Sequence, residues 1–183
     1  YFSNVGKTRR EGIESSLSGK QSRWDYALSA TWIRATYQSP FEVANPANSG
    51  SACPGADCVP VQPGARIPGV PPVIGKLLLG YRISPQTRVE AQIQAQGAQY
   101  ARGNENNLAA LGRIPGYATI GLGATHQLGK GAELSAGVSN LFDRSYANFG
   151  MLALNNVNGG TAENFLALGQ PRACWLGLRL TFD

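Results

Sequence analysis

Two cysteines lie close enough in the sequence to act together. Cys53 and Cys58 enclose the tetrapeptide Pro-Gly-Ala-Asp in a stretch rich in Pro, Gly, Ser and Asn. The spacing permits a small loop closed by a disulfide, which would indicate an oxidising compartment. The alternative is half of a zinc site, but the sequence has no second Cys or His pair to complete four ligands. The disulfide is therefore the preferred interpretation, and we expect no bound metal. The third cysteine, Cys174, lies on the apolar side of a predicted strand, where we expect a small buried hydrophobic residue.

A second candidate for chemistry is the single histidine, His126. Ser135 and Ser139 lie on the next predicted strand, so a hydrolase would pair one of them with this histidine. No nucleophile-elbow motif and no orienting acid is recognisable in the sequence. We therefore expect an interfacial His126 near one end of its strand, and we expect no catalytic residues, no enzymatic activity and no cofactor.

The composition narrows the classes of protein that could hold these residues. Among 183 residues, 43% are apolar, 15% are charged and 23 are Gly, a balance that fits alternating strands better than amphipathic helices. No apolar run approaches the roughly 20 residues of a membrane helix. The net charge of +5 is scattered, with its densest cluster at Lys7, Arg9 and Arg10. Because no broad basic surface interleaved with exposed aromatic residues is present, nucleic acid is not an expected partner.

Residues 173–182 form the most informative strand pattern of the chain. From residue 174 to 182, apolar side chains alternate with a set that includes Gly177, Arg179 and Thr181. The result is one continuously apolar side and one largely polar side. A closing strand of an outer-membrane β-barrel needs an apolar side toward lipid and a polar side toward the lumen, and here it ends in an aromatic residue, Phe182.

Six further segments show strand patterns, and each is about ten residues or longer, enough to cross a bilayer with tilt. Arg88, Glu90 and Gln92 begin a polar row that is costly to bury in an apolar core. Such a row suits an aqueous lumen or the outer face of a soluble sheet. With the closing strand, the seven predicted strands cover about residues 10–18, 23–37, 73–84, 88–96, 117–128, 132–142 and 173–182.

The connections between these strands alternate between short and long. Short turns are predicted at residues 19–22, at Pro85 and at 129–131, and long connections at 38–72, 101–115 and 143–172. All the long connections therefore lie at one end of the sheet, as in outer-membrane barrels, which have short periplasmic turns and long extracellular loops. A soluble sandwich has no reason for this asymmetry. The predicted fold is an all-β, antiparallel transmembrane β-barrel.

Several motifs make the chain similar to a known family. The sequences Asn140-Leu-Phe-Asp-Arg-Ser-Tyr-Ala147 and Pro171–Phe182 resemble the C-terminal end of TonB-dependent outer-membrane receptors. Thr8–Glu14, Ile67–Pro71 and Ile114–Tyr117 resemble motifs that recur before or within the family's strands. The resemblance implies a barrel of about 22 strands that is plugged by an N-terminal domain. Residues 1–183 would then be the C-terminal part of that barrel, without the plug and the earlier strands. We expect Asn140 and Asp143 to bind local backbone, and Phe142 to anchor at the membrane interface.

The resemblance also implies a function in the bacterial outer membrane. It predicts a receptor for energy-coupled uptake of a scarce small-molecule or metal-chelate ligand, such as a ferric siderophore. The TonB complex would bind through the missing N-terminal part, membrane lipid would surround the barrel, and the barrel-assembly machinery would recognise the C-terminal strand. The alternative is a passive porin or an adhesin barrel. The ligand-contact candidates on the long loops are Arg66, Arg102, Asn104, Glu105 and Asn107, and the expected barrel-closing signal is Trp175, Leu178, Leu180 and Phe182.

Overall fold

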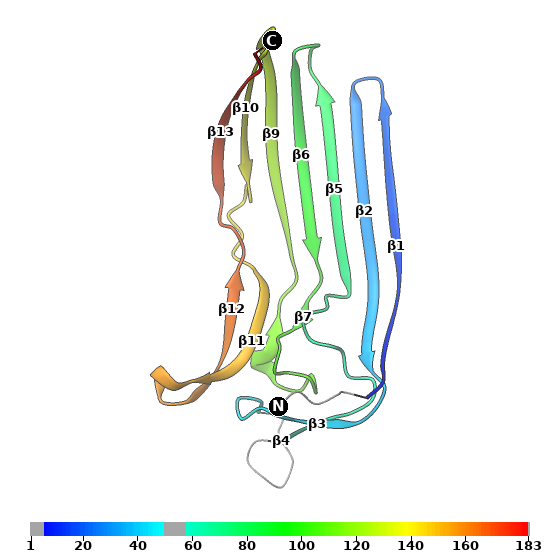
Figure 1. The fold of residues 1–183 in the computed structure, drawn as a ribbon, viewed down its shortest axis with the longest axis vertical. Coiled ribbons are helices and arrows are strands. Elements are labelled where there is room, and N and C mark those ends of the chain that lie inside the picture. The colour runs from blue at the N-terminus through cyan, green and yellow to red at the C-terminus, as the bar shows by residue number, and fades with distance from the viewer. Residues whose placement is uncertain (1–5, 50–57, 183) are drawn as a thin grey trace.

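The computed structural model describes residues 6–49 and 58–182, and its main feature is one antiparallel sheet of seven long strands. Each strand pairs with the long strand before and after it along the chain, so the sheet is a simple up-and-down meander (Figure 1). The strands are, in order, β1 (Thr8–Gln21), β2 (Trp24–Tyr37), β5 (Val73–Arg82), β6 (Thr87–Gln96), β9 (Tyr117–Gly129), β10 (Ala132–Ser139) and β13 (Ala173–Leu180).

These seven strands confirm the predicted set, with differences at their ends. Strand β1 continues to Gln21, past the predicted end at residue 18, because the chain reverses only at Ser22, which has a left-handed φ of 55°. Strand β10 ends at Ser139, short of the predicted residue 142. Its end is set by Asn140, whose φ of 47° cannot continue an extended strand.

The strand register gives the sheet two chemically different faces. On the face that we call the apolar face, Leu28, Leu77, Ile93 and Ile120 form a row across four neighbouring strands. On the opposite, polar face, Ser16, Ser29, Lys76, Gln94 and Thr119 form a similar row across five strands.

The apolar face has no layer of protein packed on it in the described part of the chain. Ile13 is 69% exposed and Leu176 is 75% exposed. An apolar surface of this extent is typical of strands that face lipid. The sheet is also open, because β1 pairs only with β2 and β13 only with β10 among the described residues. The chain is thus part of a barrel.

The long connections gather at one end of the sheet, opposite the short turns, as predicted (Figure 1). They are not irregular, however, because each contains a short antiparallel hairpin. Two small apolar clusters lie among them, one around Leu152 with Ala47 and Ala109, the other around Ile114. The hairpins are β3 (Phe41–Ala44) with β4 (Cys58–Val61), β7 (Gln99–Tyr100) with β8 (Arg113–Ile114), and β11 (Ala147–Asn155) with β12 (Thr161–Leu168).

Helical structure in the described residues is limited to two 3-10 turns. The turn η1 (Ala110–Gly112) precedes β8, and η2 (Asn156–Asn158) lies at the tip of the β11–β12 hairpin. Over residues 6–49 and 58–182, no helix has the length and apolar character needed to cross a membrane.

Candidate functional site

Asparagine side chains join the three long connections to one another. The Asn45 amide in the first connection donates to the carbonyl of Gly103 in the second (2.8 Å) and to that of Leu152 in the third (3.3 Å). Asn48 also donates to the Gly103 carbonyl, at 3.0 Å. The Asn45 and Asn48 amides thus bind backbone carbonyls, which are present whatever side chains the accepting residues carry. These bonds hold the three connections in a defined arrangement.

Two of the predicted ligand contacts serve this arrangement. Asn104 is fully buried, and its amide both donates to the Ala109 carbonyl (2.8 Å) and accepts from the Ala109 N–H (3.1 Å). Asn107 makes the same kind of pair with the backbone of Arg66, donating to its carbonyl (3.0 Å) and accepting from its N–H (2.6 Å). Asn107 has a left-handed φ of 64°, a conformation that Asn tolerates better than most residues.

The other three predicted contacts lie on the same two joined loops. The Glu105 carboxylate accepts from the N–H of Gly103 at 3.0 Å, so it shapes its own turn. Arg102 is exposed, and its backbone pairs with β11 through Gly150 (2.9 Å) and Leu152 (2.7 Å). Within residues 6–49 and 58–182, neither the Arg102 nor the Arg66 guanidinium has a hydrogen bond or an ion pair in this structure. The five residues are thus brought onto neighbouring loops, with two cationic groups available to an anion.

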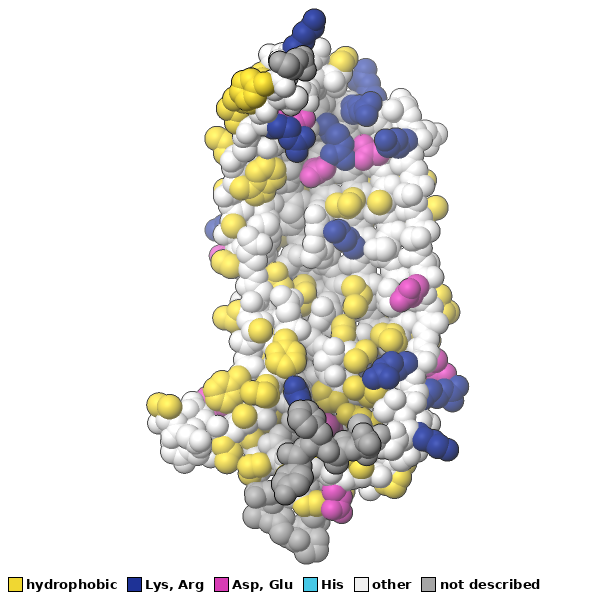
Figure 2. Space-filling view, viewed as in Figure 1, with side chains coloured by type: hydrophobic (Ala, Val, Ile, Leu, Met, Phe, Trp, Pro, Cys, Tyr) yellow, Lys and Arg dark blue, Asp and Glu magenta, His cyan; other side chains and the backbone are white. Residues whose placement is uncertain are grey.

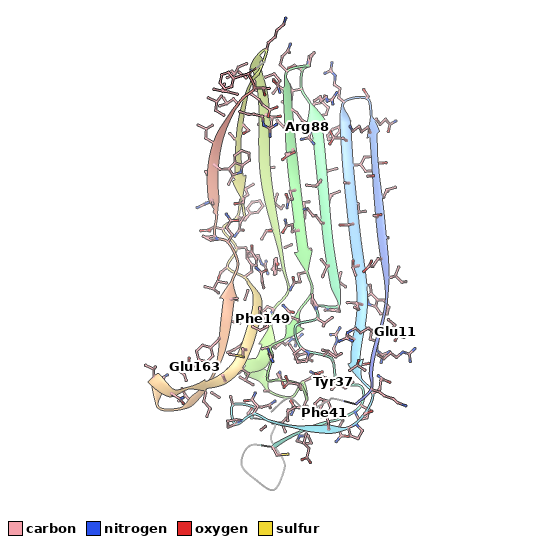
Figure 3. All side chains as sticks on the ribbon, viewed as in Figure 1. Glu11, Tyr37, Phe41, Arg88, Phe149 and Glu163 are labelled. Atoms are coloured by element: carbon pink, nitrogen blue, oxygen red, sulfur yellow. The ribbon has the colours of Figure 1, made fainter. Side chains whose placement is uncertain are left out.

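The tip of the β11–β12 hairpin carries a carboxylate held by amides. Glu163 accepts from Asn158 (3.0 Å) and from Asn155 (2.9 Å), and the Asn155 side chain also accepts from the N–H of Val157 (3.0 Å). These hydrogen bonds, first from Asn158 and then from Asn155, lower the pKa of the Glu163 carboxyl below its ordinary value. Figure 3 shows Glu163 on this hairpin, beyond the end of the long strands.

The Asn-Leu-Phe-Asp motif fixes both ends of the third long connection. Asn140 is buried; its amide donates to the carbonyls of Arg144 (2.9 Å) and Gln170 (3.0 Å) and accepts from the Arg144 N–H (3.0 Å). Asp143 accepts from the N–H of Arg172 at 2.8 Å. The predicted structural role of these two residues is confirmed: they tie the start of the connection to its return into β13.

Most charged side chains on the polar face lie toward the short turns. Figure 2 shows this face, with Lys, Arg, Asp and Glu side chains gathered over that end and mostly uncharged side chains along the middle. Arg88 binds Asp25 (2.7 Å) and also Glu90, across and along the strands. This link was not predicted from the sequence. Gly80, which lies between Asp25 and Glu90 in the register, leaves the space because a Cβ there would meet both Arg88 and Asp25.

The middle of the polar face is hollowed. A shallow depression of about 180 Å³ lies between the strands and the return of the third connection. Its lining combines amide, hydroxyl and aromatic groups with the Glu90 carboxylate, and it includes Leu122 and Val138. Such a wall can hydrogen-bond water or a polar solute along the sheet, and it has the character of the lining of an aqueous passage.

The hydrolase alternative is wrong, because the histidine and the serines that it requires lie on opposite faces of the sheet. His126 pairs in register with Leu134 and therefore lies on the apolar face, where its Nδ1 is 2.9 Å from the Thr87 hydroxyl. Ser135 and Ser139 lie on the polar face, and their hydroxyls donate to carbonyls of β13. A histidine cannot act as base for a serine on the opposite side of the same sheet.

The cysteines and the closing strand have different outcomes. Cys53 lies outside the described residues, so the disulfide with Cys58, the first residue of β4, stays a prediction. Cys174 is free and exposed on the apolar face, so the expectation of burial is wrong for this chain. The reason is that no layer of protein packs on the apolar face in the described part of the chain. Of the predicted barrel-closing residues, Trp175 lies on the polar face, Leu178 and Leu180 lie on the apolar face, and Phe182 follows the strand.

Comparison with known proteins supports this architecture. A family model described as "TonB dependent receptor-like, beta-barrel" matches residues 1–141. No curated protein sequence matches the chain.

Solved structures have the same fold. The siderophore receptor PiuA from Acinetobacter baumannii superposes with a TM-score of 0.74 at 19% identity, over 97% of this chain and 22% of its own length. The ferric yersiniabactin uptake receptor FyuA from Yersinia pestis gives 0.70 at 20% identity, over 98% and 24%. The copper transporter OprC gives 0.65 at 17% identity, over 96% and 24%. The chain therefore spans about a quarter of the length of these proteins.

Proposed function

Because the chain belongs to the TonB-dependent receptor-like β-barrel family, we propose that it is the C-terminal part of an energy-coupled outer-membrane receptor. The complete receptor takes up a scarce extracellular ligand, of which a ferric siderophore is the leading candidate. The TonB complex acts through a plug and an N-terminal segment outside these 183 residues. The barrel-assembly machinery recognises β13.

The observation that carries this proposal is the joined set of long connections above a polar sheet face. Loops held by the Asn45, Asn48 and Asn107 bonds form a fixed surface at the entrance to the lumen. A fixed surface loses less conformational entropy on binding than flexible loops do, and this favours capture of a dilute ligand. A passive porin needs only the wall and has no need for ordered hairpins above it.

Cationic groups on that surface point to an anionic ligand. Arg66 and Arg102 supply planar guanidinium groups that suit carboxylate, phosphate or catecholate oxygens of a metal chelate. Asn104, Asn107 and Glu105 act mainly by holding the loop that carries them. PiuA is described as a siderophore receptor, FyuA as a ferric yersiniabactin uptake receptor and OprC as a copper transporter, so proteins with this fold take different ligands.

The test is ligand binding to the complete receptor, with a panel of ferric siderophores as probes. We expect Arg66→Gln with Arg102→Gln to weaken binding at least tenfold, since each charge-assisted bond contributes about 1.5–3 kcal/mol. Arg23→Gln, which removes the same charge in the turn at the opposite end of the sheet, is the control. Unchanged affinity in the double variant would remove these two residues from the site.

Energy coupling separates the receptor from the passive porin or adhesin. Cells that carry the complete receptor should accumulate the bound siderophore only while the proton gradient is intact. Accumulation that continues after the gradient is dissipated would favour a porin, and binding without any accumulation would favour an adhesin.

A further inference from the structure

Charged residues on the apolar face of the sheet are confined to one place. By register, the Asp, Glu, Lys and Arg side chains on that face of the seven long strands are Arg9, Glu11 and Arg34, all on β1 and β2. Lys7 precedes β1 with the same parity. The apolar sides of the five other strands carry none, so this cluster is not part of a general scatter of surface charge.

The cluster lies at the border of the apolar band. Arg9 and Glu11 are followed along β1 on the same face by Ile13 and Leu17, whose partners on β2 are Trp32 and Leu28. Figure 3 shows Glu11 on the part of β1 nearer the long connections. Charges are costly within the hydrocarbon layer, whereas long Arg side chains at its border reach the headgroups. In a barrel that spans a membrane, this position corresponds to headgroup level in the leaflet on the side of the long connections.

The Glu11 carboxylate holds the guanidinium groups of Arg9 and Arg34 on one patch, where both can contact one anion. The Glu11 carboxylate binds Arg9 at 2.6 Å and lies 3.9 Å from Arg34, so it holds both groups on one patch. Both Arg side chains remain more than 60% exposed. One carboxylate cannot neutralise two guanidinium groups and a nearby ammonium, and the patch therefore keeps a net positive charge.

We propose that Arg9 and Arg34, with Lys7, form a binding site for the phosphate-bearing headgroup of a membrane lipid in the leaflet on the side of the long connections. The planar fork of Arg matches phosphate oxygens, and acyl chains of the same lipid can lie along the apolar surface of Ile13 and Trp32. The site faces away from the polar side, so it is independent of ligand uptake through the lumen.

The experiment uses the complete receptor in phosphatidylcholine nanodiscs that contain phosphatidic acid, with retained lipid measured by native mass spectrometry. Arg9→Gln with Arg34→Gln should weaken phosphatidic acid binding about 10- to 30-fold. Arg10→Gln is a matched control, because Arg10 is adjacent in sequence but pairs with Ala35 on the polar face. Excess inorganic phosphate should not displace the lipid, since it offers no acyl chains.

Three outcomes would overturn the proposal: equal binding by the double variant and the wild type, an equal loss in the Arg10 control, or displacement by free phosphate. Heat-modifiable migration on gels checks that each variant is folded. Siderophore binding by the same double variant should remain at the wild-type level. A loss of lipid binding alone would therefore support the lipid site. A failure of siderophore binding in all samples, wild type included, would contradict the proposed function and leave the test of the lipid site intact.

Discussion

Replacement of Asn140 by alanine should release the third long connection without unfolding the sheet. The change removes three hydrogen bonds to the buried amide, to Arg144 and Gln170, each contributing about 1 kcal/mol. It also places alanine at a φ of 47°, a left-handed conformation that costs about 1 kcal/mol more. The sum is about 4 kcal/mol for local opening, which raises the open fraction on the order of a thousandfold.

Limited proteolysis of the complete receptor measures this opening at the tied ends of the connection, around residues 144–147 and 168–172, where cleavage requires the chain to detach. Asn140→Gly removes the three hydrogen bonds, but glycine adopts a left-handed φ without strain. Its cleavage rate should therefore rise only about a hundredfold. Phe142→Ala, in the same motif but on a side chain that is 73% exposed, should change little. Cleavage of Asn140→Ala at the wild-type rate would refute the reasoning. Wild-type behaviour of Asn140→Gly would mean that backbone conformation alone matters.

Three further changes test other parts of the structure. Because hydrogen bonds lower the pKa of Glu163, they stabilise the β11–β12 tip above the ordinary carboxyl pKa of 4.5, and that contribution disappears as the pH falls through the lower folded value; amide protection factors in the hairpin, corrected for the pH dependence of intrinsic exchange, should fall there. Asn107→Ala breaks its paired bonds to the backbone of Arg66 and should speed exchange of the Arg66 amide at least tenfold. Gly137→Ala places a Cβ 2.7 Å from the Trp175 ring, so the ring must move and its fluorescence should shift.

Matched variants show whether each effect has the stated cause. Glu163→Gln should make the amide protection factors of the hairpin nearly independent of pH in the acidic range. A fall of these protection factors in acid that persists in the variant would place the titrating group elsewhere. Asn107→Gly keeps the left-handed conformation, so exchange that matches the wild type would show that the side-chain bonds contribute nothing. Gly75→Ala has open space at its Cβ, and a fluorescence shift there equal to that of Gly137→Ala would contradict the contact with Trp175.

The strands of the sheet could be predicted because the alternation of apolar and polar residues depends only on the medium that each face of the sheet contacts. Alternation such as Val89, Glu90, Ala91 and Gln92 assigns every residue to a face whatever its neighbours are. Strand ends were less accurate where a single backbone conformation decides them, as Ser22 and Asn140 do with their left-handed φ values. Asn and Ser occur often in turns, but the sequence alone does not say which of them reverses the chain.

The long connections were beyond this kind of reasoning because their order comes from contacts between segments far apart in sequence. Asn45 bonds Leu152 across more than a hundred residues, and no local periodicity indicates such a pair. The same limit applies to the candidate site. Its polarity and its place on a loop predict that Asn104 contacts a ligand, yet it is buried with both ends of its amide bonded to Ala109. Polarity on a loop therefore indicates either a ligand contact or a support for the loop, and only burial separates the two.

The Arg residues also fall into two groups, according to whether carboxylates of the protein match their charge. On the polar face, Arg88 is paired with Asp25 and Glu90 across a glycine, so its charge is largely satisfied by the wall itself. At the ends of the long loops and at the border of the apolar band, the guanidinium groups outnumber the carboxylates that contact them. An Arg whose charge is matched within the sheet stabilises the wall, whereas an Arg with excess charge at a boundary attracts an anion from the adjoining medium. In the proposed receptor, that medium is extracellular water for Arg66 and Arg102, and the lipid headgroup layer for Arg9 and Arg34.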